Sequence, residues 1–367
     1  MSNFRLFWPK WVIAGTLATA SLAIQAATAF PALDRPALKV SAPERQVMQS
    51  AAQAGQRIVA VGERGIVALS DDGGTTWRQA QNVPVSTTLT AVFFVDDKLG
   101  WAVGHGGAIL HTRDGGETWM RQTEGRALAA AVLDTAEAAA RRQPESPKAR
   151  GDLDAATRLV EDGADKPLLD VFFSDASHGW AVGAYNLFFE THDGGKSWHS
   201  VGDRLDNPRS LHLNAIQARG TNVFIVGEQG RIYRSTDGGQ TFTTLSSPYK
   251  GSLFTVSLAP GGHVVVAGLR GNAFSSEDSG GSWRRIEGLS PVSIFGMAVL
   301  DDGGVLFANQ GGQLFVKRSG ADAVPMPMPS LPPLAGMLVL RDGGIVVLGP
   351  GGAMRVPGES SKNRTFK

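Results

Sequence analysis

The chain has 367 residues, which is enough for one large domain or two of ordinary size. Lys and Arg number 35 against 34 Asp and Glu, so the chain has no strong basic field, which argues against generic binding to nucleic acid or to an anionic membrane. The 46 glycines and 8 tryptophans indicate many tight turns packed by a few large side chains, and they favour an all-β repeat protein over a helical one.

Residues 1–29 have the pattern of a signal peptide. Arg5 and Lys10 give a positive start, residues 11–24 form an apolar run, and residues 27–29 offer a small-x-small cleavage pattern. We expect cleavage between Ala29 and Phe30 and a periplasmic or otherwise exported mature chain; the alternative is retention as an N-terminal anchor. The sequence contains no cysteine, so we expect neither a disulfide nor a lipid-bearing cysteine.

A polar motif of the form Ser/Thr-x-Asp-x-Gly-x-Ser/Thr-Trp/Phe occurs five times between residues 70 and 283. It resembles the Asp-box, or BNR repeat, of β-propellers. Its aspartates are Asp72, Asp114, Asp193, Asp237 and Asp278, and its aromatic residues are Trp77, Trp119, Trp198, Phe242 and Trp283. Because all five copies share one chemistry, whereas an active site needs one special copy, we interpret them as structural turns. We place each box between the third and fourth strands of a repeat, with the carboxylate accepting backbone N–H bonds.

The spacing of the boxes predicts the fold. Successive aspartates are 42, 79, 44 and 41 residues apart, and a period near 42 is the length of a four-stranded propeller blade. Five units end in a box and two degenerate copies follow near the end, which makes seven units, and we predict an all-β, seven-bladed β-propeller over residues 30–367; a solenoid is the alternative. The last unit shows only three strand signals, so we expect residues 37–41 to supply its outer strand and close the ring.

The step of 79 residues contains an insertion at residues 124–166. This segment is rich in alanine and other helix formers, and Gly163 ends it. Two short apolar stripes run through it, one at Leu128, Val132, Leu133 and Ala136 and the other at Leu153, Ala156 and Val160. We predict a helical hairpin inserted between the second and third blades.

The turns between the second and third strands differ from one repeat to the next, unlike the boxes. In a propeller these turns share a face with the connections between blades, and the helical insertion is such a connection. We therefore select six turn residues as candidates for partner binding: Arg64, His105, Tyr185, Asn186, Gln229 and Arg270. The alternative is that they are ordinary polar turn residues.

The sequence contains little evidence of a catalytic site. Asp-boxes also occur in sialidases, but the chain has only three tyrosines and lacks the Phe-Arg-Ile-Pro signature that opens those domains. A glycan-binding or sialidase-like propeller remains the alternative function. The seven histidines are scattered and show no His-x-x-x-His spacing, so we expect no catalytic residue, no metal and no cofactor.

Residues 45–356 resemble one family in particular, on the box spacing and on the repeated Gly-Trp-Ala-Val-Gly at 100–104 and 179–183. This is the photosystem II assembly and stability factor family, whose members are seven-bladed Asp-box propellers. The resemblance implies a non-enzymatic, exported assembly factor that acts in photosynthesis or in a bacterial counterpart. Its partner would be a protein, such as a membrane-protein subunit or a transporter, rather than nucleic acid or a small molecule. We expect a monomer, and the helical insertion departs from the compact family pattern.

Overall fold

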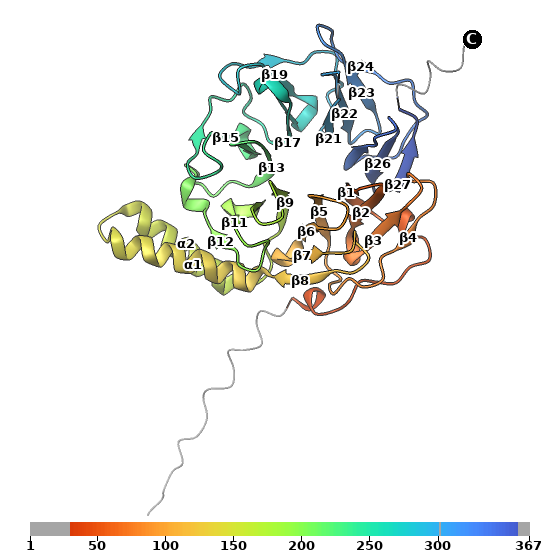
Figure 1. Ribbon diagram of the computed structural model, residues 1–367. Helices are drawn as coiled ribbons and strands as arrows, with labels where there is room; N and C mark the ends of the chain where they lie inside the picture. Colours follow the sequence, from red (N-terminus) through yellow and green to blue (C-terminus); the bar gives the residue numbers. More distant parts are fainter. Residues whose placement is uncertain (1–29, 301, 359–367) are drawn as a thin grey trace, which may run out of the picture.

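The computed structural model describes residues 30–300 and 302–358, so the predicted signal peptide lies outside the described residues. Within them, no helix has both the length and the apolar character needed to span a membrane. Seven antiparallel sheets form a ring, six with four strands and one with three (Figure 1). The predicted seven-bladed propeller with an inserted helical pair is confirmed.

Each blade is a meander of consecutive strands, numbered here from the inner strand outward. Blade 1 holds β1 (Met48–Ala54), β2 (Arg57–Gly62), β3 (Val67–Ser70) and β4 (Arg78–Gln79). Blade 2 holds β5 (Leu89–Phe94), β6 (Gly100–Gly104), β7 (Ile109–Thr112) and β8 (Met120–Thr123), and blade 3 holds β9 (Leu168–Phe173), β10 (Gly179–Gly183), β11 (Phe188–Thr191) and β12 (His199–Ser200). Blade 4 holds β13 (Leu213–Arg219), β14 (Asn222–Gly227), β15 (Ile232–Ser235) and β16 (Thr243–Thr244), and blade 5 holds β17 (Leu253–Leu258), β18 (Val264–Gly268), β19 (Ala273–Ser276) and β20 (Arg284–Arg285). Blade 6 holds β21 (Ile294–Val299), β22 (Val305–Asn309), β23 (Leu314–Lys317) and β24 (Val324–Pro325), and blade 7 holds β25 (Gly336–Val339), β26 (Ile345–Gly349) and β27 (Gly352–Val356).

The core of the ring lies between neighbouring blades. The second strands are apolar on both faces because each sheet is covered on both sides; every residue of β6 and β10 is buried. Trp101 of blade 2 stacks on Phe173 of blade 3, with ring centroids 3.6 Å apart. Trp180 of blade 3 packs in the same way into a cluster shared with blade 4. The large apolar side chains therefore hold each blade to the next.

The predicted closing strand is wrong. Blade 7 has three strands, and residues 37–41 form no strand. They lie beside the outer part of blade 1 instead, where the N–H of Ala37 donates to Val83 (3.0 Å) and the N–H of Val40 donates to the Gln79 side chain (3.0 Å). The ring closes where β25 and β26 pack against β1. Arg355 on β27 strengthens this seam through a hydrogen bond to the carbonyl of Gly73 in blade 1.

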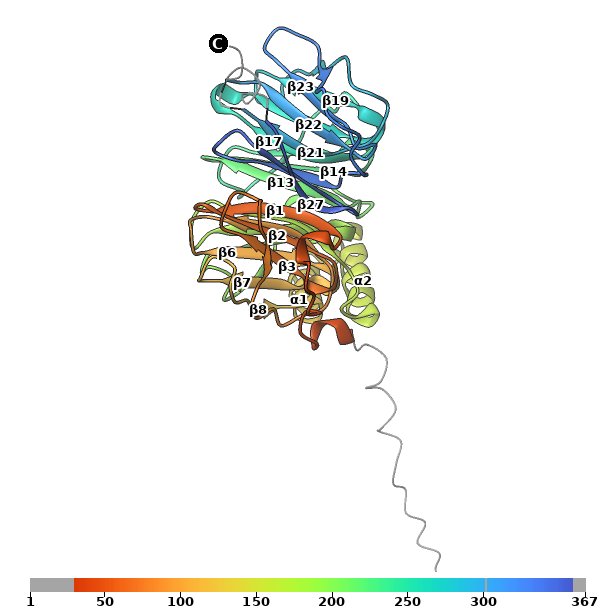
Figure 2. The ribbon, with the colours of Figure 1, turned by 90° about the vertical axis from the view of Figure 1, so that its right-hand side faces the viewer.

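The insertion between β8 and β9 forms two antiparallel helices, α1 (Gly125–Arg142) and α2 (Pro147–Asp162). The side chains of Glu124 and Ser146 cap their N-termini, and Gly163 ends α2 with a φ of 81°. The pair projects beyond the ring next to β12 (Figure 1), and from the side α2 follows one face of the ring (Figure 2). One expected stripe differs: Val160 is 40% exposed, and the neighbouring Leu159 packs against the propeller instead.

Candidate partner-binding site

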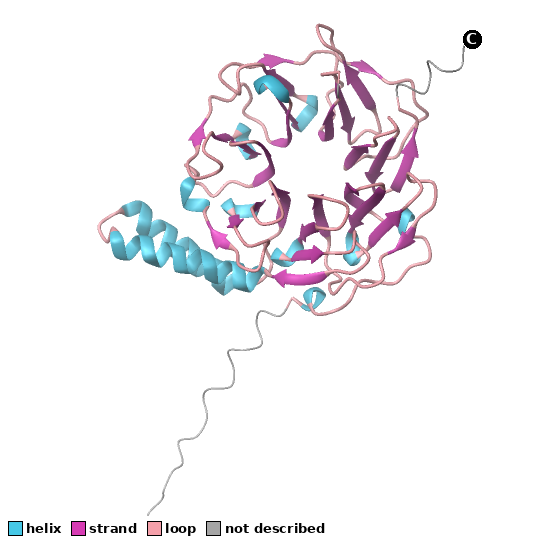
Figure 3. Cartoon of the chain, in the orientation of Figure 1, coloured by secondary structure: helices cyan, strands magenta, loops and turns pink. Residues whose placement is uncertain are grey.

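Strand direction places the helical pair and the variable turns at the same end of the ring. In an antiparallel meander, successive turns alternate between the two ends. Figure 3 shows the loops that connect the strands. The boxes join third to fourth strands and so lie at one end. The second-to-third-strand turns and the connections between blades, which include α1 and α2, lie at the other. The start of α1 contacts the turn His105–Gly107, and a Cβ at Gly107 would lie 2.6 Å from the Cα of Gly125.

The variable turns share one backbone conformation. In blades 1–5 the two central residues of each turn have positive φ, which is the type I′ geometry that suits the twist of a β-hairpin. Arg64, Tyr185, Gln229 and Arg270 occupy the first central position, with φ between 53° and 57°, and all four are exposed. His105 is exposed but precedes this position, which Gly106 fills. Non-glycine residues are uncommon at such φ values, so the fold imposes this backbone conformation on the four residues.

Asn186 has an inward position, unlike the other candidates. It takes the second central position of its turn, with a φ of 65°, where most of the other blades have glycine. Its side-chain amide donates to the carbonyl of Gly202 (3.1 Å), and its oxygen accepts from the buried Asn207 (2.9 Å). Asn186 therefore ties its turn to the connection between blades 3 and 4, and so positions that connection.

A groove of about 430 Å³ lies between the helical pair and blade 3, and we call it the hairpin groove. One wall consists of helical side chains, the other of Tyr185, Asn186 and the connection from blade 3 to blade 4. Its apolar lining includes Val132, Ala136, Ala139, Ala155, Leu159, Leu187, Leu205 and Pro208. Segments about 70 residues apart in sequence are thus brought to one concave surface, which is a common form of binding site.

Charged groups at the hairpin groove are mostly paired. Lys166 lies 3.0 Å from Asp162 and 2.8 Å from Asp165, and 5.4 Å from the Tyr185 ring centroid. Burial lowers the pKa of Lys166, but the bonds to both carboxylates outweigh it, so the pKa lies above its usual value. Tyr185 is 54% exposed and meets the ring of His212 edge to face at 4.9 Å. Lys166 and His212 already restrict the Tyr185 ring, so its exposed side can contact a ligand with little further loss of side-chain freedom.

The structure brings only some of the predicted residues together. Tyr185 and Asn186 line the hairpin groove, and Gln229 is linked to its rim by a hydrogen bond from Arg209. Arg64 and Arg270 belong to turns of blades 1 and 5, outside the hairpin groove. No sequence pattern indicated Lys166 or the wall at 202–210, because both depend on how the insertion folds back on blade 3.

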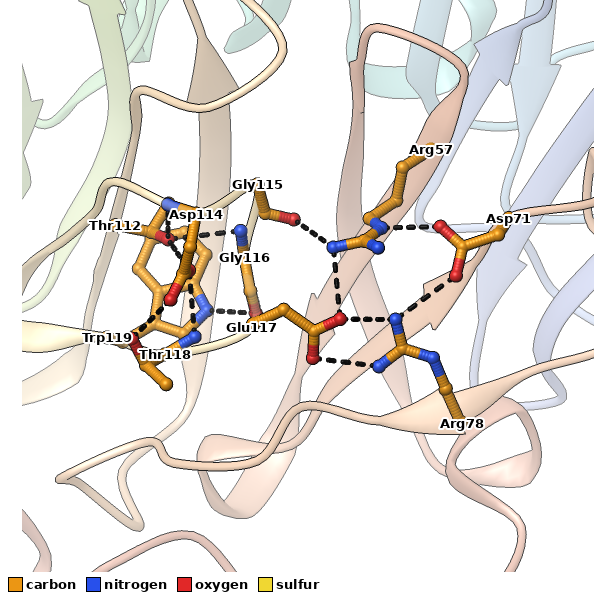
Figure 4. Close-up of polar contacts among 10 residues, drawn as sticks. All are labelled: Arg57, Asp71, Arg78, Thr112, Asp114, Gly115, Gly116, Glu117, Thr118 and Trp119. Atoms are coloured by element: carbon orange, nitrogen blue, oxygen red, sulfur yellow. Dashed lines mark hydrogen bonds and ion pairs between the residues drawn. The ribbon is translucent and has the colours of Figure 1, made fainter.

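The boxes at the opposite end repeat one network, shown for blade 2 in Figure 4. Thr112 and Thr118 donate side-chain hydrogen bonds to the Asp114 carboxylate, the N–H of Thr118 also donates to it (3.0 Å), and the Trp119 indole N–H donates to Gly116 (2.9 Å). The two hydroxyl bonds to the aspartate carboxylate recur in all five boxes. Such bonds lower the pKa of Asp72 to about 2, with the Thr76 hydroxyl as the largest cause.

An ion-pair network joins the boxes of blades 1 and 2 (Figure 4). Arg57 lies 2.5 Å from Asp71 and donates to the carbonyl of Gly115 (3.2 Å), and Arg78 bridges Asp71 and Glu117. Each charged side chain in the network pairs with one of opposite charge on a neighbouring strand or turn. This arrangement makes the boxes of blades 1 and 2 a joint between these two blades.

Comparison with known proteins agrees with this architecture. A family model described as "Photosynthesis system II assembly factor YCF48" matches residues 154–247, from α2 to just beyond β16. The photosystem II assembly lipoprotein Ycf48 of Synechococcus sp. (strain CC9902) is 40% identical over 77 residues, 21% of this chain and 23% of that protein. Its namesake in Prochlorococcus marinus (strain MIT 9313) is 30% identical over 138 residues, 26% of this chain and 41% of that protein. Over these residues the chain is similar to the photosystem II assembly factors.

Solved structures show the same fold over most of the ring. "YCF48 bound to D1 peptide" matches with a TM-score of 0.61 and 17% identity, covering 89% of this chain and all of the other. YCF48 from Cyanidioschyzon merolae gives 0.60 and 15%, covering 87% and 98%. The WD40 propeller domain of Doa1 gives 0.58 and 11%, covering 89% and 97%. At these identities the likeness shows the fold alone, and the chain spans less than half the length of the curated relatives it matches.

Proposed function

We propose that this chain is a non-enzymatic assembly factor that binds an apolar peptide segment of a protein partner in the hairpin groove. The observation that carries the proposal is the groove itself, which joins a concave apolar lining to a braced, exposed Tyr185. Arg158 lines the groove, and its side chain makes no hydrogen bond or ion pair among the described residues. It offers a charge for a carboxylate of the bound segment.

Two further observations support the proposal. The family match at 154–247 includes the second half of α2, the Tyr185 turn and the connection at 202–210, which together form most of the groove. One solved Ycf48 propeller of the same fold is described as bound to a D1 peptide. The outer candidates Arg64, His105, Gln229 and Arg270 would then contact parts of the partner that extend across the same face.

The test is to obstruct the hairpin groove without disturbing the propeller. Ala155 is exposed on α2 and lines the groove, so Ala155→Trp fills it. Ala130 is exposed on α1 outside the groove, so Ala130→Trp is the matched control. A photo-crosslinking residue at position 185 identifies the partner, and pull-downs with each variant measure binding. We expect Ala155→Trp to lower capture at least about tenfold, equivalent to roughly 1.4 kcal/mol, and Ala130→Trp to leave it unchanged.

Equal capture by both variants would contradict the hairpin groove as the binding site. Crosslinks to glycans in place of protein would favour the glycan-binding alternative. Substituting Arg64 and Arg270 together should weaken capture less than Ala155→Trp does and leave the melting temperature nearly unchanged, since exposed charges contribute little to stability.

We also propose that the chain is exported and monomeric, and that its partner is a membrane protein. Both curated relatives are named lipoproteins, whereas this chain has no cysteine to carry a lipid. Export would therefore end in a freely released chain, and mass spectrometry of the protein from its host should give Phe30 as the N-terminal residue. Detection of residues 1–29 on the mature protein would show an anchor instead.

A further inference from the structure

We infer that blade 3 carries a zinc-binding site at the box end of the ring, formed by His178, Glu190 and His192. The ligands would be two imidazole nitrogens and one carboxylate oxygen. This site lies at the end of the ring opposite the hairpin groove, so it is independent of the proposed partner binding.

The fold itself brings the three positions together. Gly179 on β10 pairs with Thr191 on β11, so the preceding His178 lies opposite the following His192. Glu190 is two residues from His192 and therefore on the same face of its strand. As a result, the Nε2 atom of His178 is 3.0 Å from one oxygen of Glu190, and the Nε2 atom of His192 is 3.4 Å from the other. The three ligand atoms lie within 4.8 Å of one another.

The distance from His178 to the carboxylate is close to that between ligands of a tetrahedral ion, and a movement of the His192 side chain would close the remaining gap. Zinc bonds to nitrogen and oxygen of about 2.1 Å place the ligand atoms of a tetrahedral site roughly 3.4 Å apart. His192 is 57% exposed and can adjust its torsions, whereas Glu190, at 3%, is held in place. Two nitrogens and one oxygen favour zinc over magnesium or calcium, which prefer oxygen ligands throughout. Three protein ligands leave a fourth position for water.

Groups around Glu190 resemble the outer shell of a metal site. The indole N–H of Trp180 donates to one carboxylate oxygen (3.1 Å), and Arg204 donates to the other (2.9 Å). Arg204 also donates to the carbonyl of Gly239 in the box of blade 4 (2.8 Å). Each oxygen thus accepts one hydrogen bond, and together these bonds hold the carboxylate in one orientation with its oxygens beside the two imidazoles. Hydrogen bonds of this kind fix the direction of a ligating carboxylate.

The same three positions meet in the other blades but hold different chemistry. Their register is fixed by the pairing of second and third strands in blades 1, 2, 4 and 5. The residues there are Arg57, Leu69 and Asp71 in blade 1, Leu99, His111 and Arg113 in blade 2, Asn222, Arg234 and Thr236 in blade 4, and His263, Ser275 and Glu277 in blade 5. Among these five blades, blade 3 alone fills all three positions with side chains that bind metal ions.

Other blades supply substitutions that fit the site sterically. His192→Thr installs the residue of blade 4, and His178→Leu installs that of blade 2. His263→Leu makes the same change as His178→Leu at the matching position of blade 5, where no second imidazole is present, and serves as the control.

The experiment titrates zinc chloride into the untagged full-length chain, stripped of metal with EDTA, and follows heat and thermal unfolding. We expect one ion per chain and a rise in melting temperature, because a ligand that binds only the folded state stabilises it. His192→Thr and His178→Leu should each weaken zinc affinity at least about tenfold, while His263→Leu should not. Circular dichroism confirms that each variant is folded. Magnesium chloride should give neither heat nor stabilisation, and cobalt chloride should give the visible absorption of a tetrahedral site in the wild-type chain only.

Two results would overturn the inference. One is the absence of zinc binding and of any shift in melting temperature at millimolar zinc chloride. The other is zinc binding of unchanged stoichiometry and affinity in both His192→Thr and His178→Leu, which would place the ion elsewhere on the chain.

Discussion

Tryptophans in equivalent boxes differ in whether the indole N–H has a hydrogen-bond partner. Trp119 is 1% exposed, and its indole N–H donates to Gly116, whereas the indole N–H of Trp198 is buried without a hydrogen-bond partner among the described residues. The shared sequence pattern predicted the aromatic position in both boxes. It could not predict this difference, because the partner of the N–H depends on small shifts of the backbone within each box.

Truncating Trp119 should be costly. We expect Trp119→Ala to lower the free energy of unfolding by about 3–5 kcal/mol, since it leaves a cavity between blades. Trp119→Phe should cost about 1 kcal/mol through the lost hydrogen bond, and Trp198→Phe should cost less because its N–H has no bond to lose. Urea unfolding of the three variants checks this. An equal cost for the two phenylalanine variants would contradict the role assigned to the Trp119 hydrogen bond.

Asp170 on β9 should make stability depend on pH. Its carboxylate accepts from the N–H groups of Val171 and Ile216, both at 2.9 Å, but burial raises its pKa to about 7. A pKa raised above the unfolded value means that the folded state binds the proton more tightly. The contribution of Asp170 is therefore fully present below about pH 4 and is lost as the pH rises through about 7.

The test compares the wild-type chain with Asp170→Asn, which does not titrate. The melting temperature of the variant relative to wild type should rise steadily from pH 5 to pH 8. The box aspartates do not interfere, because hydrogen bonds lower the pKa of Asp72, Asp193 and Asp278 to about 2, and their stabilisation is lost only as the pH falls toward that value. A difference that does not change with pH would show that Asp170 stays ionised in the folded chain.

At the scale of elements, the helical pair is part of the core at its base and a projection at its tip. Leu128 is 2% exposed and packs with Trp101, Leu168 and Phe173, and Ala164 is 3% exposed in the core around blades 1 and 2. Alanine content and the closing glycine were sufficient to predict the helices. The angle at which they meet blade 3 could not be predicted, since it depends on close backbone contact at Gly107 and on the connection at 202–210.

Deletions in the helical pair should therefore have unequal effects. Removing residues 126–165 discards Leu128 and Ala164 and should cost at least the roughly 2–5 kcal/mol of a Leu→Ala change in a core. Removing only residues 138–151, with a short Gly-Ser bridge, should change the free energy of unfolding by less than about 1 kcal/mol, because the discarded segment includes a single buried side chain, Ala149. Thermal unfolding of both deletions distinguishes the base from the tip. A tip deletion as damaging as the full one would show that the two helices stabilise the ring along their whole length.

At the scale of the whole molecule, the repeat predicted the ring but not its seam. A period near 42 residues marks the blades because each blade repeats the same strands and box. Residues 37–41 were assigned to blade 7 because that blade lacked a strand, but strand pairing also needs matching partners. Gln79 and Val83 supply those partners on blade 1. Linear spacing also could not indicate the zinc site that we propose in blade 3, since strand pairing brings His178 beside His192.

The seam between blades 7 and 1 should be the weakest part of the ring. Among residues 30–300 and 302–358, blade 7 has no fourth strand and no strand is shared across the seam. Arg355 bonds to Gly73 across it while pairing with Asp342 at 2.7 Å. Amide hydrogen exchange should be faster in β25–β27 than in β9–β11, and Arg355→Ala should raise it several-fold in blades 7 and 1 only. A uniform increase around the ring would mean that the blades open together.

Closure without a shared strand also bears on how the chain is made. Each of the seven sheets is built from one continuous stretch of sequence, in the order in which the ribosome delivers it. Blade 1 can complete its hydrogen bonding as soon as residue 79 has emerged, and no early strand waits with an open edge for the C-terminus. The ring can therefore assemble blade by blade during synthesis. Its last step is the docking of residues 336–356 onto a surface that has already formed.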